Sequence, residues 1–168
     1  MSMATHVVQS SIRPNQVDFA GIAVRAAGLG CLLGVSLTTA FFITPATWPA
    51  LACYVAALSL FHILEFWTTA AYNPENVKTD SFLLSSNGIA YWAAQATGVV
   101  EYLIVDHAKP AWHVNAYASG AFFAGLICLL TGQLIRSVAM AQAAQSFSHS
   151  LAYTKKEGHV LVTGGLYS

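Results

Sequence analysis

Long apolar runs alternate with short polar segments along this chain, and the lengths of the runs predict membrane-spanning helices. A helix needs about 20 apolar residues to cross the hydrocarbon of a bilayer. The runs that reach or approach this length cover residues 21–43, 46–68, 88–105 and 113–135. The pattern therefore predicts an all-α fold, a polytopic membrane helix bundle with about four transmembrane helices.

The polar segments between the runs predict how the helices connect. The first two runs are separated by TPATWP, in which Pro45 and Pro49 interrupt helical hydrogen bonding and Trp48 suits a membrane interface. We expect an antiparallel hairpin there. The segment TAAYNPENVKTDSFLLSSNG is too polar to lie in lipid, and its Asn-Pro pair indicates a turn. It predicts a structured loop between the second and third helices.

Composition supports a membrane protein and excludes other classes. Hydrophobic residues make up 56% of the chain and charged residues 8%, whereas soluble domains carry roughly a quarter charged residues. Seven basic residues balance seven acidic ones, so there is no excess positive charge for binding nucleic acid. The three cysteines lie inside apolar runs and predict no disulfide framework. The first run is too long for the core of a signal peptide, so we expect a retained anchor.

Basic residues set the expected orientation. With four crossings, one side of the membrane would hold Arg13, Arg25, Lys78, Arg136, Lys155 and Lys156, against Lys109 on the other side. An excess of Lys and Arg marks the cytosolic side. Both ends of this chain are therefore expected in the cytosol.

His62 and Glu65 are ionisable residues inside the second run, and each needs a partner because a charge within a membrane is costly. Their spacing of three places them on one helix face. One interpretation is half of a metal site, but Glu101 has no histidine beside it at helical spacing, unlike the paired Glu-x-x-His motifs of di-iron bundles. The favoured interpretation is that both side chains bind the second helix to a neighbouring helix or loop by hydrogen bonds. We expect no metal.

Gly30 and Gly34 form a G-x-x-x-G motif in the first run. This spacing lets two helix backbones approach closely. It is compatible with a homodimer and with packing inside the same chain.

After residue 135 the pattern changes from a membrane helix to a polar segment that ends in HVLVTGGLYS, which looks like a strand running into a glycine turn. His149 and His159 are ten residues apart, a spacing that matches no common zinc signature. We expect residues 1–140 to form the transmembrane helical region and residues 141–168 to begin a cytosolic cap.

Two long stretches of this chain resemble one family. FHILEFWTTAAYNPENVKTDSFLLSSNGIAYWAAQATGVVEY and RSVAMAQAAQSFSHSLAYTKKEGHVLVTGGLYS look like the protein-S-isoprenylcysteine O-methyltransferases. These are integral membrane enzymes that methylate the C-terminal carboxylate of prenylated proteins. The resemblance begins at Phe61 and combines F-H-x-x-E-F, Y-N-P and D-S-F-L with H-x-L-V-T-x-G-x-Y.

The resemblance implies a cofactor site in the tail. In the family, H-x-L-V-T-x-G-x-Y forms one wall of the pocket for S-adenosylmethionine, the methyl donor. The residues that would line it here are His159, Val160, Leu161, Val162 and Tyr167. Without the resemblance, residues 160–162 would be interpreted as an ordinary buried strand. The catalytic residues remain unassigned.

The resemblance also implies partners and a location: prenylated protein C-termini, a lipid membrane and the endoplasmic reticulum. In the family the tail motif continues into Arg-His-Pro, with an arginine for the carboxylate further on, so we expect this chain to be the first part of a longer enzyme. We also expect the prenyl group to enter laterally between helices. Four aromatic residues are hypothesised to line that passage: Phe66, Trp67, Tyr91 and Trp92.

Two other function classes compete with the enzyme. One is a catalytically inactive membrane protein that acts as a scaffold or dimerises through Gly30 and Gly34. The other is a small transporter with a proton path through Glu65 and Glu101.

Overall fold

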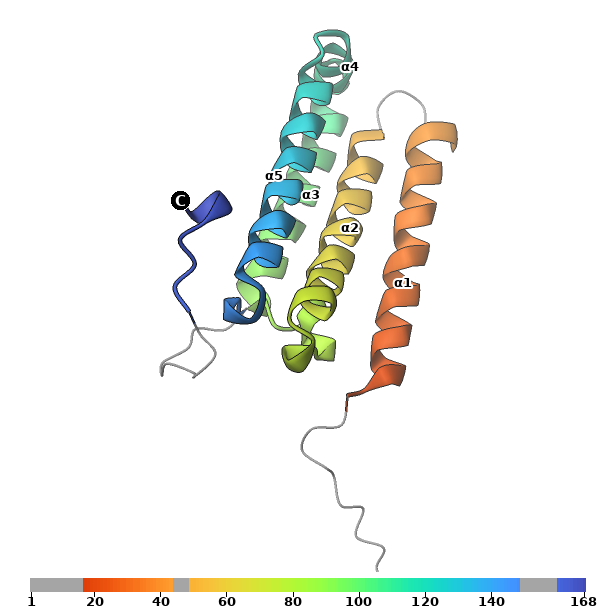
Figure 1. Ribbon diagram of the computed structural model, residues 1–168. Coiled ribbons are helices and arrows are strands. Elements are labelled where there is room, and N and C mark those ends of the chain that lie inside the picture. Colours follow the sequence, from red (N-terminus) through yellow and green to blue (C-terminus); the bar gives the residue numbers. More distant parts are fainter. Residues whose placement is uncertain (1–16, 44–48, 149–159) are drawn as a thin grey trace, which may run out of the picture.

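A computed structural model describes residues 17–43, 49–148 and 160–168, and the protein is an all-helical bundle (Figure 1). Its long helices are α1 (Phe19–Thr38), α2 (Pro49–Tyr72), α3 (Gly88–Ala108) and α5 (Ala121–Ala143). The shorter elements are η1 (Thr39–Ile43), η2 (Pro74–Asn76), η3 (Thr79–Phe82), α4 (Pro110–Ala118), η4 (Ala144–Ser146) and η5 (Gly165–Tyr167). The long helices run up and down along one axis. The predicted fold class is confirmed.

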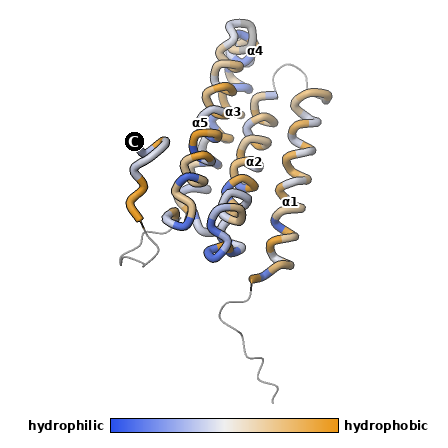
Figure 2. Tube along the Cα trace, viewed as in Figure 1, coloured by the Kyte–Doolittle hydropathy of each residue, from blue (hydrophilic) through white to orange (hydrophobic). Residues whose placement is uncertain are grey.

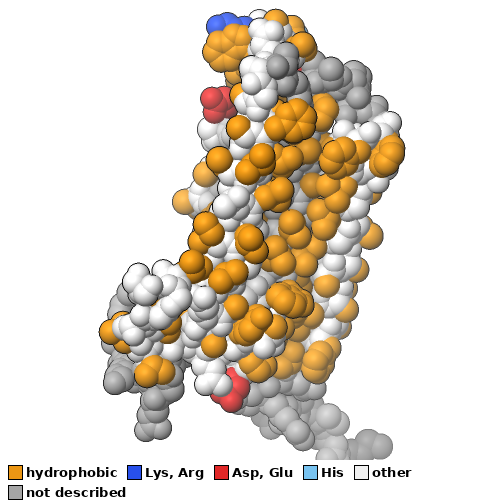
Figure 3. Space-filling view, turned by 45° about the horizontal axis from the view of Figure 1, so that its top comes forward, with side chains coloured by type: hydrophobic (Ala, Val, Ile, Leu, Met, Phe, Trp, Pro, Cys, Tyr) orange, Lys and Arg blue, Asp and Glu red, His pale blue; other side chains and the backbone are white. Residues whose placement is uncertain are grey.

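Three helices of the described residues are long and apolar enough to cross a membrane: Phe19–Phe42, Pro49–Tyr72 and Ala121–Ser146. α3 is 21 residues long but is not among them. Hydrophobic residues run along the helices and hydrophilic ones gather toward the ends (Figure 2). In a space-filling view, hydrophobic side chains cover most of the visible bundle surface between its ends (Figure 3). This surface suits a lipid environment.

One predicted helix is wrong. The predicted start of the second helix at residue 46 falls outside the described residues, and its described part begins at Pro49, a residue type well suited to the first helical position. The predicted fourth helix, 113–135, is in fact two helices, since Gly120 adopts a φ of 75° between α4 and α5. This left-handed conformation stops the first helix at little cost for a glycine. His113 lies on α4, where its Nδ1 is 2.9 Å from Asp106 Oδ1 at the end of α3.

α2 is the central helix, and its buried positions are unusually polar. It packs against α1, as the predicted antiparallel hairpin requires, and also against α5. Its buried side chains are Ala56, Ser59, His62, Glu65, Thr68 and Thr69. In a membrane each buried polar group must find its partner inside the protein.

The partners of His62 and Glu65 confirm the hydrogen-bond interpretation. His62 Nδ1 donates to the carbonyl oxygen of Phe82 in the following loop, at 2.7 Å. A carbonyl can only accept, so Nδ1 carries the proton, and in the neutral ring Nε2 accepts from the Tyr91 hydroxyl at 3.4 Å. The Glu65 carboxylate accepts two hydrogen bonds from Arg136 of α5, one of them from Nη2 at 3.0 Å. These contacts join α2 to the loop, to α3 and to α5.

The Glu65–Arg136 pair predicts unequal effects for its two single substitutions. Glu65 is 1% exposed, whereas the Arg136 side chain is 43% exposed. Arg136→Met should destabilise the bundle by about 3–5 kcal/mol, because it leaves a charge buried without a partner. Glu65→Gln should cost less, since a long cationic side chain reaches toward water. Unfolding of both variants and the double variant in lipid nanodiscs would measure this; equal losses would contradict it.

Candidate functional site

The tail Val160–Ser168 lies along the last turns of α5 and is held there by hydrogen bonds. The backbone N–H of Leu166 donates to Gln142 Oε1 at 2.9 Å. The Tyr167 hydroxyl donates to the carbonyl oxygen of Ala139 at 3.2 Å. The N–H of Val160 donates to Ser146 Oγ at 3.2 Å. Gly165 has a φ of 66° beside Gln142, so a side chain there would be strained and would collide with it.

The tail residues predicted to line a cofactor pocket form an open surface. Val160 is 75% exposed and Leu161 88% exposed, and the described part of the tail contains no strand. The alternative interpretation as a buried strand is therefore wrong. Tyr167 is anchored to α5 and exposed at 45%, and Val162 is half-buried. His159 lies outside the described residues.

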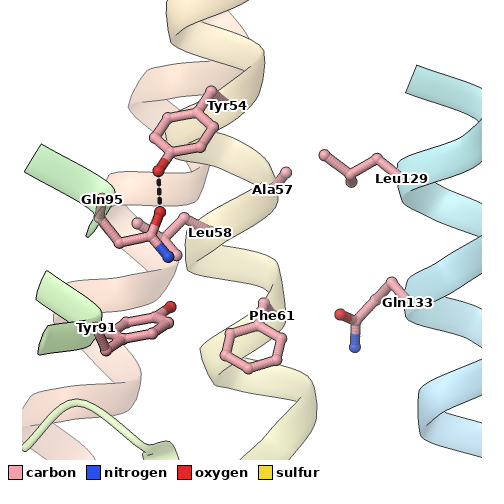
Figure 4. A pocket seen from close by; sticks show the side chains of 8 residues that line it. All are labelled: Tyr54, Ala57, Leu58, Phe61, Tyr91, Gln95, Leu129 and Gln133. Carbon is pink, nitrogen blue, oxygen red and sulfur yellow. Dashed lines mark hydrogen bonds between the residues drawn. The ribbon is translucent and has the colours of Figure 1, made fainter. Parts of the chain in front are cut away.

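A cavity of about 280 Å³ lies between α2, α3 and α5 (Figure 4). Its lining is mainly apolar and aromatic. On one side the Tyr54 hydroxyl donates to Gln95 Oε1, and the Gln133 side chain lies on the opposite side. The Arg136 guanidinium lies over the ring of Phe61, which lines the cavity, at 5.5 Å from its centre. The Glu65–Arg136 pair follows one helical turn further along both helices. It therefore lies between this cavity and the cytosolic ends that we expect for α2 and α5.

A second hollow of about 370 Å³ lies between α2 and α5 and is called the α2–α5 groove. Its lining residues are Leu60, Leu64, Trp67, Thr68, Tyr72, Leu130, Gln133, Leu134, Ser137, Val138 and Ala141. Gln133 lines the cavity as well. The groove extends to the last residue of α2, whereas the cavity ends at Phe61.

The four aromatic residues hypothesised to line one passage lie in different places. Trp67 lines the α2–α5 groove and Tyr91 lines the cavity. Phe66 stacks on Phe82, with ring centres 4.2 Å apart. Trp92 stacks on His62 and donates through Nε1 to the carbonyl oxygen of Leu84 at 2.6 Å. As a single lining set, this hypothesis is not supported.

The structure separates other residues considered together in the sequence. Glu65 is paired with Arg136, whereas Glu101 is exposed on α3, which is weak ground for a shared proton path. Within the described ranges, no three His, Cys, Asp or Glu side chains gather where they could hold a metal ion.

Sequence reasoning missed two residues that shape these sites. Gln142, which anchors the tail, lies at the Ala- and Gln-rich end of α5. The residue pattern there does not indicate that one of the glutamines bonds to the tail. Thr68 is 2% exposed, and its hydroxyl has no hydrogen-bond partner. A threonine in an apolar run gives no signal, because its hydroxyl usually bonds to the carbonyl four residues earlier, as Thr69 does to Glu65.

Three known proteins with similar sequences are named protein-S-isoprenylcysteine O-methyltransferase. The chain is 37% identical to the protein-S-isoprenylcysteine O-methyltransferase of Schizosaccharomyces pombe, over 90% of the chain and 66% of that protein. It is 39% identical to that of Saccharomyces cerevisiae over 68% of the chain and 49% of that protein, and 31% identical to that of Homo sapiens over 88% and 50%. The chain thus spans about half to two thirds of these relatives. No protein-family model matches.

A solved structure also resembles this fold. It is described as the eukaryotic intramembrane Ras methyltransferase ICMT (isoprenylcysteine carboxyl methyltransferase). The TM-score is 0.77 at 32% sequence identity, over 88% of this chain and 51% of that chain. The similarity therefore extends to the arrangement of the helices.

Gln142→Ala should release the end of the tail without disturbing the bundle. The lost hydrogen bond is worth about 1 kcal/mol, so hydrogen exchange of the Leu166 amide should become roughly fivefold faster. Gln145→Ala is the matched control, since Gln145 is exposed one turn nearer the tail. Unchanged exchange in Gln142→Ala, measured by NMR or mass spectrometry, would show that other contacts hold the tail.

Proposed function

Since the chain belongs to the protein-S-isoprenylcysteine O-methyltransferase family, we propose that it serves the methylation of prenylated protein C-termini. In this proposal residues 1–140 form the membrane core, and residues 141–168 begin the S-adenosylmethionine-binding region. His159, Val160, Leu161, Val162 and Tyr167 line the methyl-donor pocket. The single observation that carries the proposal is the docking of the tail on α5 with apolar side chains left open.

The chemistry of the tail fits S-adenosylmethionine. In this proposal the backbone N–H and C=O groups of Leu161 and Val162, which make no backbone hydrogen bond to another described residue, bind the edge of an adenine ring. The exposed side chains of Val160 and Leu161 offer an apolar surface for the ring face. Neither acidic nor basic side chains occur in the described tail, 160–168. Any charged group on the donor or the acceptor needs partners from other residues.

The proposed methyl transfer depends on positioning of the two reactants and not on acid–base catalysis. When bound, S-adenosylmethionine supplies a methyl group that moves to a carboxylate oxygen as the C–S bond breaks and both bonding electrons stay on sulfur. The accepting carboxylate is already ionised at neutral pH, so no side chain has to remove a proton. Holding two reactants in line is worth about 7–11 kcal/mol. The tail contributes by fixing the donor at one depth along α5.

The membrane explains how the acceptor reaches the tail. A prenyl chain gains about 0.8 kcal/mol for each buried CH2, so lateral entry between helices keeps it out of water. We place both ends of the chain in the cytosol, because Arg25, Lys78 and Arg136 belong to one end of the bundle and Lys109 to the other. The endoplasmic reticulum membrane is the proposed location.

A second candidate function is that of a scaffold or dimerisation partner without catalysis, and one observation favours a dimer. Gly30 and Gly34 are exposed, and a Cβ added to either would meet no atom within 4 Å. The side of α1 that faces the bundle instead buries Leu29 and Ser36. The open glycines therefore offer a close-packing surface to a second copy.

Leu161→Glu should weaken binding of S-adenosylmethionine at least tenfold, because a carboxylate replaces an apolar contact in the proposed pocket. Titration calorimetry on the protein in detergent would measure this. Leu161→Met is the conservative control and should bind almost normally. Leu161 is 88% exposed, so neither substitution should alter thermal stability. If the unmodified protein fails to bind the donor, the enzyme proposal is rejected for this chain in favour of the scaffold.

Gly30→Leu combined with Gly34→Leu should abolish dimers if these residues form the contact. Chemical crosslinking in membranes would report the dimer fraction. Gly28→Leu is the control, since Gly28 lies on the other flank of α1 and is also open. An equal dimer fraction in all three proteins would exclude this surface.

A further inference from the structure

Asn73 follows the last residue of α2, and the chain leaves the helix there because Pro74 comes next. The residue before a proline avoids the helical conformation, and Asn73 has a φ of −141° and a ψ of 57°. Asn73 is nonetheless buried, at 3% exposed. A residue in the turn after a membrane helix would ordinarily face water. The burial of this amide therefore indicates a contact with another part of the chain.

The Asn73 amide is held in one orientation by two hydrogen bonds. Its Nδ2 donates to the carbonyl oxygen of Phe147 at 3.0 Å, and its Oδ1 accepts from Nδ2 of Asn76 at 2.8 Å. A carbonyl oxygen can only accept, so the nitrogen of the Asn73 amide must face Phe147. The bond from Asn76 fixes the amide in the orientation that this contact requires. Asn73 thereby joins the end of α2 to a residue 74 positions later in the chain.

The segment that Asn73 contacts contains a strained turn. α5 ends at Ala144, whose φ of 45° and ψ of −121° belong to a conformation that glycine adopts readily and alanine rarely. The η4 turn begins at this residue, and the N–H of Phe147 closes it on the carbonyl oxygen of Ala144 at 3.1 Å. A strained backbone persists only where its surroundings hold it. Asn73 supplies such a hold from the end of α2, because it binds the carbonyl of the residue that closes the turn.

η4 also makes the first contact with the described tail. The described part of the wall proposed for the methyl donor, here called the donor wall, consists of residues 160–162 and 167. Ser146 Oγ in η4 accepts from the N–H of Val160, where this wall begins, at 3.2 Å. The far end of the tail is bonded separately to Gln142 of α5. The tail therefore has two anchors, one on α5 itself and one that runs through η4 to Asn73.

We infer that Asn73 is a positioning residue for the donor wall, which it holds at the end of α2 through η4 and Ser146. This inference rests on the proposed function. The Asn73 amide is engaged by Phe147 and Asn76, so it acts through the backbone of η4 and not by touching the methyl donor. Because methyl transfer depends on the placement of two reactants, a shift of the wall weakens donor binding. The alternative is that Asn73 only stabilises the loop after α2.

Amide hydrogen exchange of the full protein in nanodiscs tests the link from Asn73 to the tail. Asn73→Asp keeps the shape and one acceptor oxygen but turns a second oxygen toward the carbonyl of Phe147. Exchange of the Val160 amide should become about fivefold faster, the effect of losing one hydrogen bond. Ser81→Ala is the matched control, since Ser81 lies in the same loop, is 4% exposed and accepts from a backbone N–H at 3.1 Å. Equal exchange at Val160 in both variants would overturn the link.

Binding of S-adenosylmethionine tests whether this link positions the donor wall. Titration calorimetry in detergent would compare Asn73→Asp, Ser146→Ala and the double variant. Each single substitution should raise the Kd about fivefold, and the double variant should raise it no further, because both substitutions break the same link. A roughly 25-fold rise in the double variant would show independent effects and overturn the inference.

Ser146→Ala also keeps the test decisive if Asn73→Asp fails to fold. Ser146 is half-buried, and its substitution removes the contact with Val160 while leaving the buried Asn73 amide in place. A raised Kd in this variant supports the positioning of the wall by η4. An unchanged Kd would overturn it.

The two readouts separate this inference from the proposed function. Unchanged donor binding in Asn73→Asp, together with faster exchange at Val160, would restrict Asn73 to a structural role and leave the methyltransferase proposal intact. Failure of the unmodified protein to bind the donor would reject the proposed function, and with it any role of Asn73 in donor binding. Ser81→Ala should bind the donor as the unmodified protein does. An equal loss of donor binding in Ser81→Ala and Asn73→Asp would identify general destabilisation of the loop as the cause and overturn the positioning role.

Discussion

The ion pair between the buried carboxylate of Glu65 and the more exposed Arg136 is the contact on which the rest of the structure depends. It joins the middle of the central helix to α5, and apolar packing alone would not fix the register of two helices in lipid, where the surroundings are as apolar as the interface. By setting that register it also divides the space between the helices. The cavity lies on the bilayer side of the pair, and the groove passes it toward the helix ends.

The same requirement, that polar groups in lipid find partners inside the protein, explains the other contacts of α2. His62 binds the loop carbonyl of Phe82. Asn73, the residue that follows α2, donates through Nδ2 to the carbonyl oxygen of Phe147 at 3.0 Å, which fastens the end of this helix to the segment after η4. Thr68 is the exception among these buried groups.

The lengths of the apolar runs were sufficient to predict a helical bundle, because few structures other than helices can cross a membrane. The spacing of His62 and Glu65 was sufficient to predict that both bond to a neighbouring helix or loop, but not which residues are their partners. It could not place Gly120 as a helix end, since apolar residues continue on both sides of that glycine and only its backbone conformation breaks the helix. For the tail, the family motif indicated the residues but not their exposure. The anchor Gln142 and the unsatisfied Thr68 depend on tertiary geometry, which no residue pattern reports.

The depth of the groove and of the tail in the membrane determines whether they can serve a reaction between a water-soluble donor and a lipid-anchored acceptor. A water-soluble methyl donor and a lipid-anchored carboxylate can meet only near the membrane interface, so a useful site must extend from lipid to that level. Of the two hollows described here, only the groove continues to the end of α2, where the tail is fixed on the far side of α5. A reaction in line requires the methyl donor and the carboxylate to be in direct contact. Because α5 separates the groove from the tail, equal depth alone does not bring the two together, and the path of the acceptor has to pass around the end of this helix.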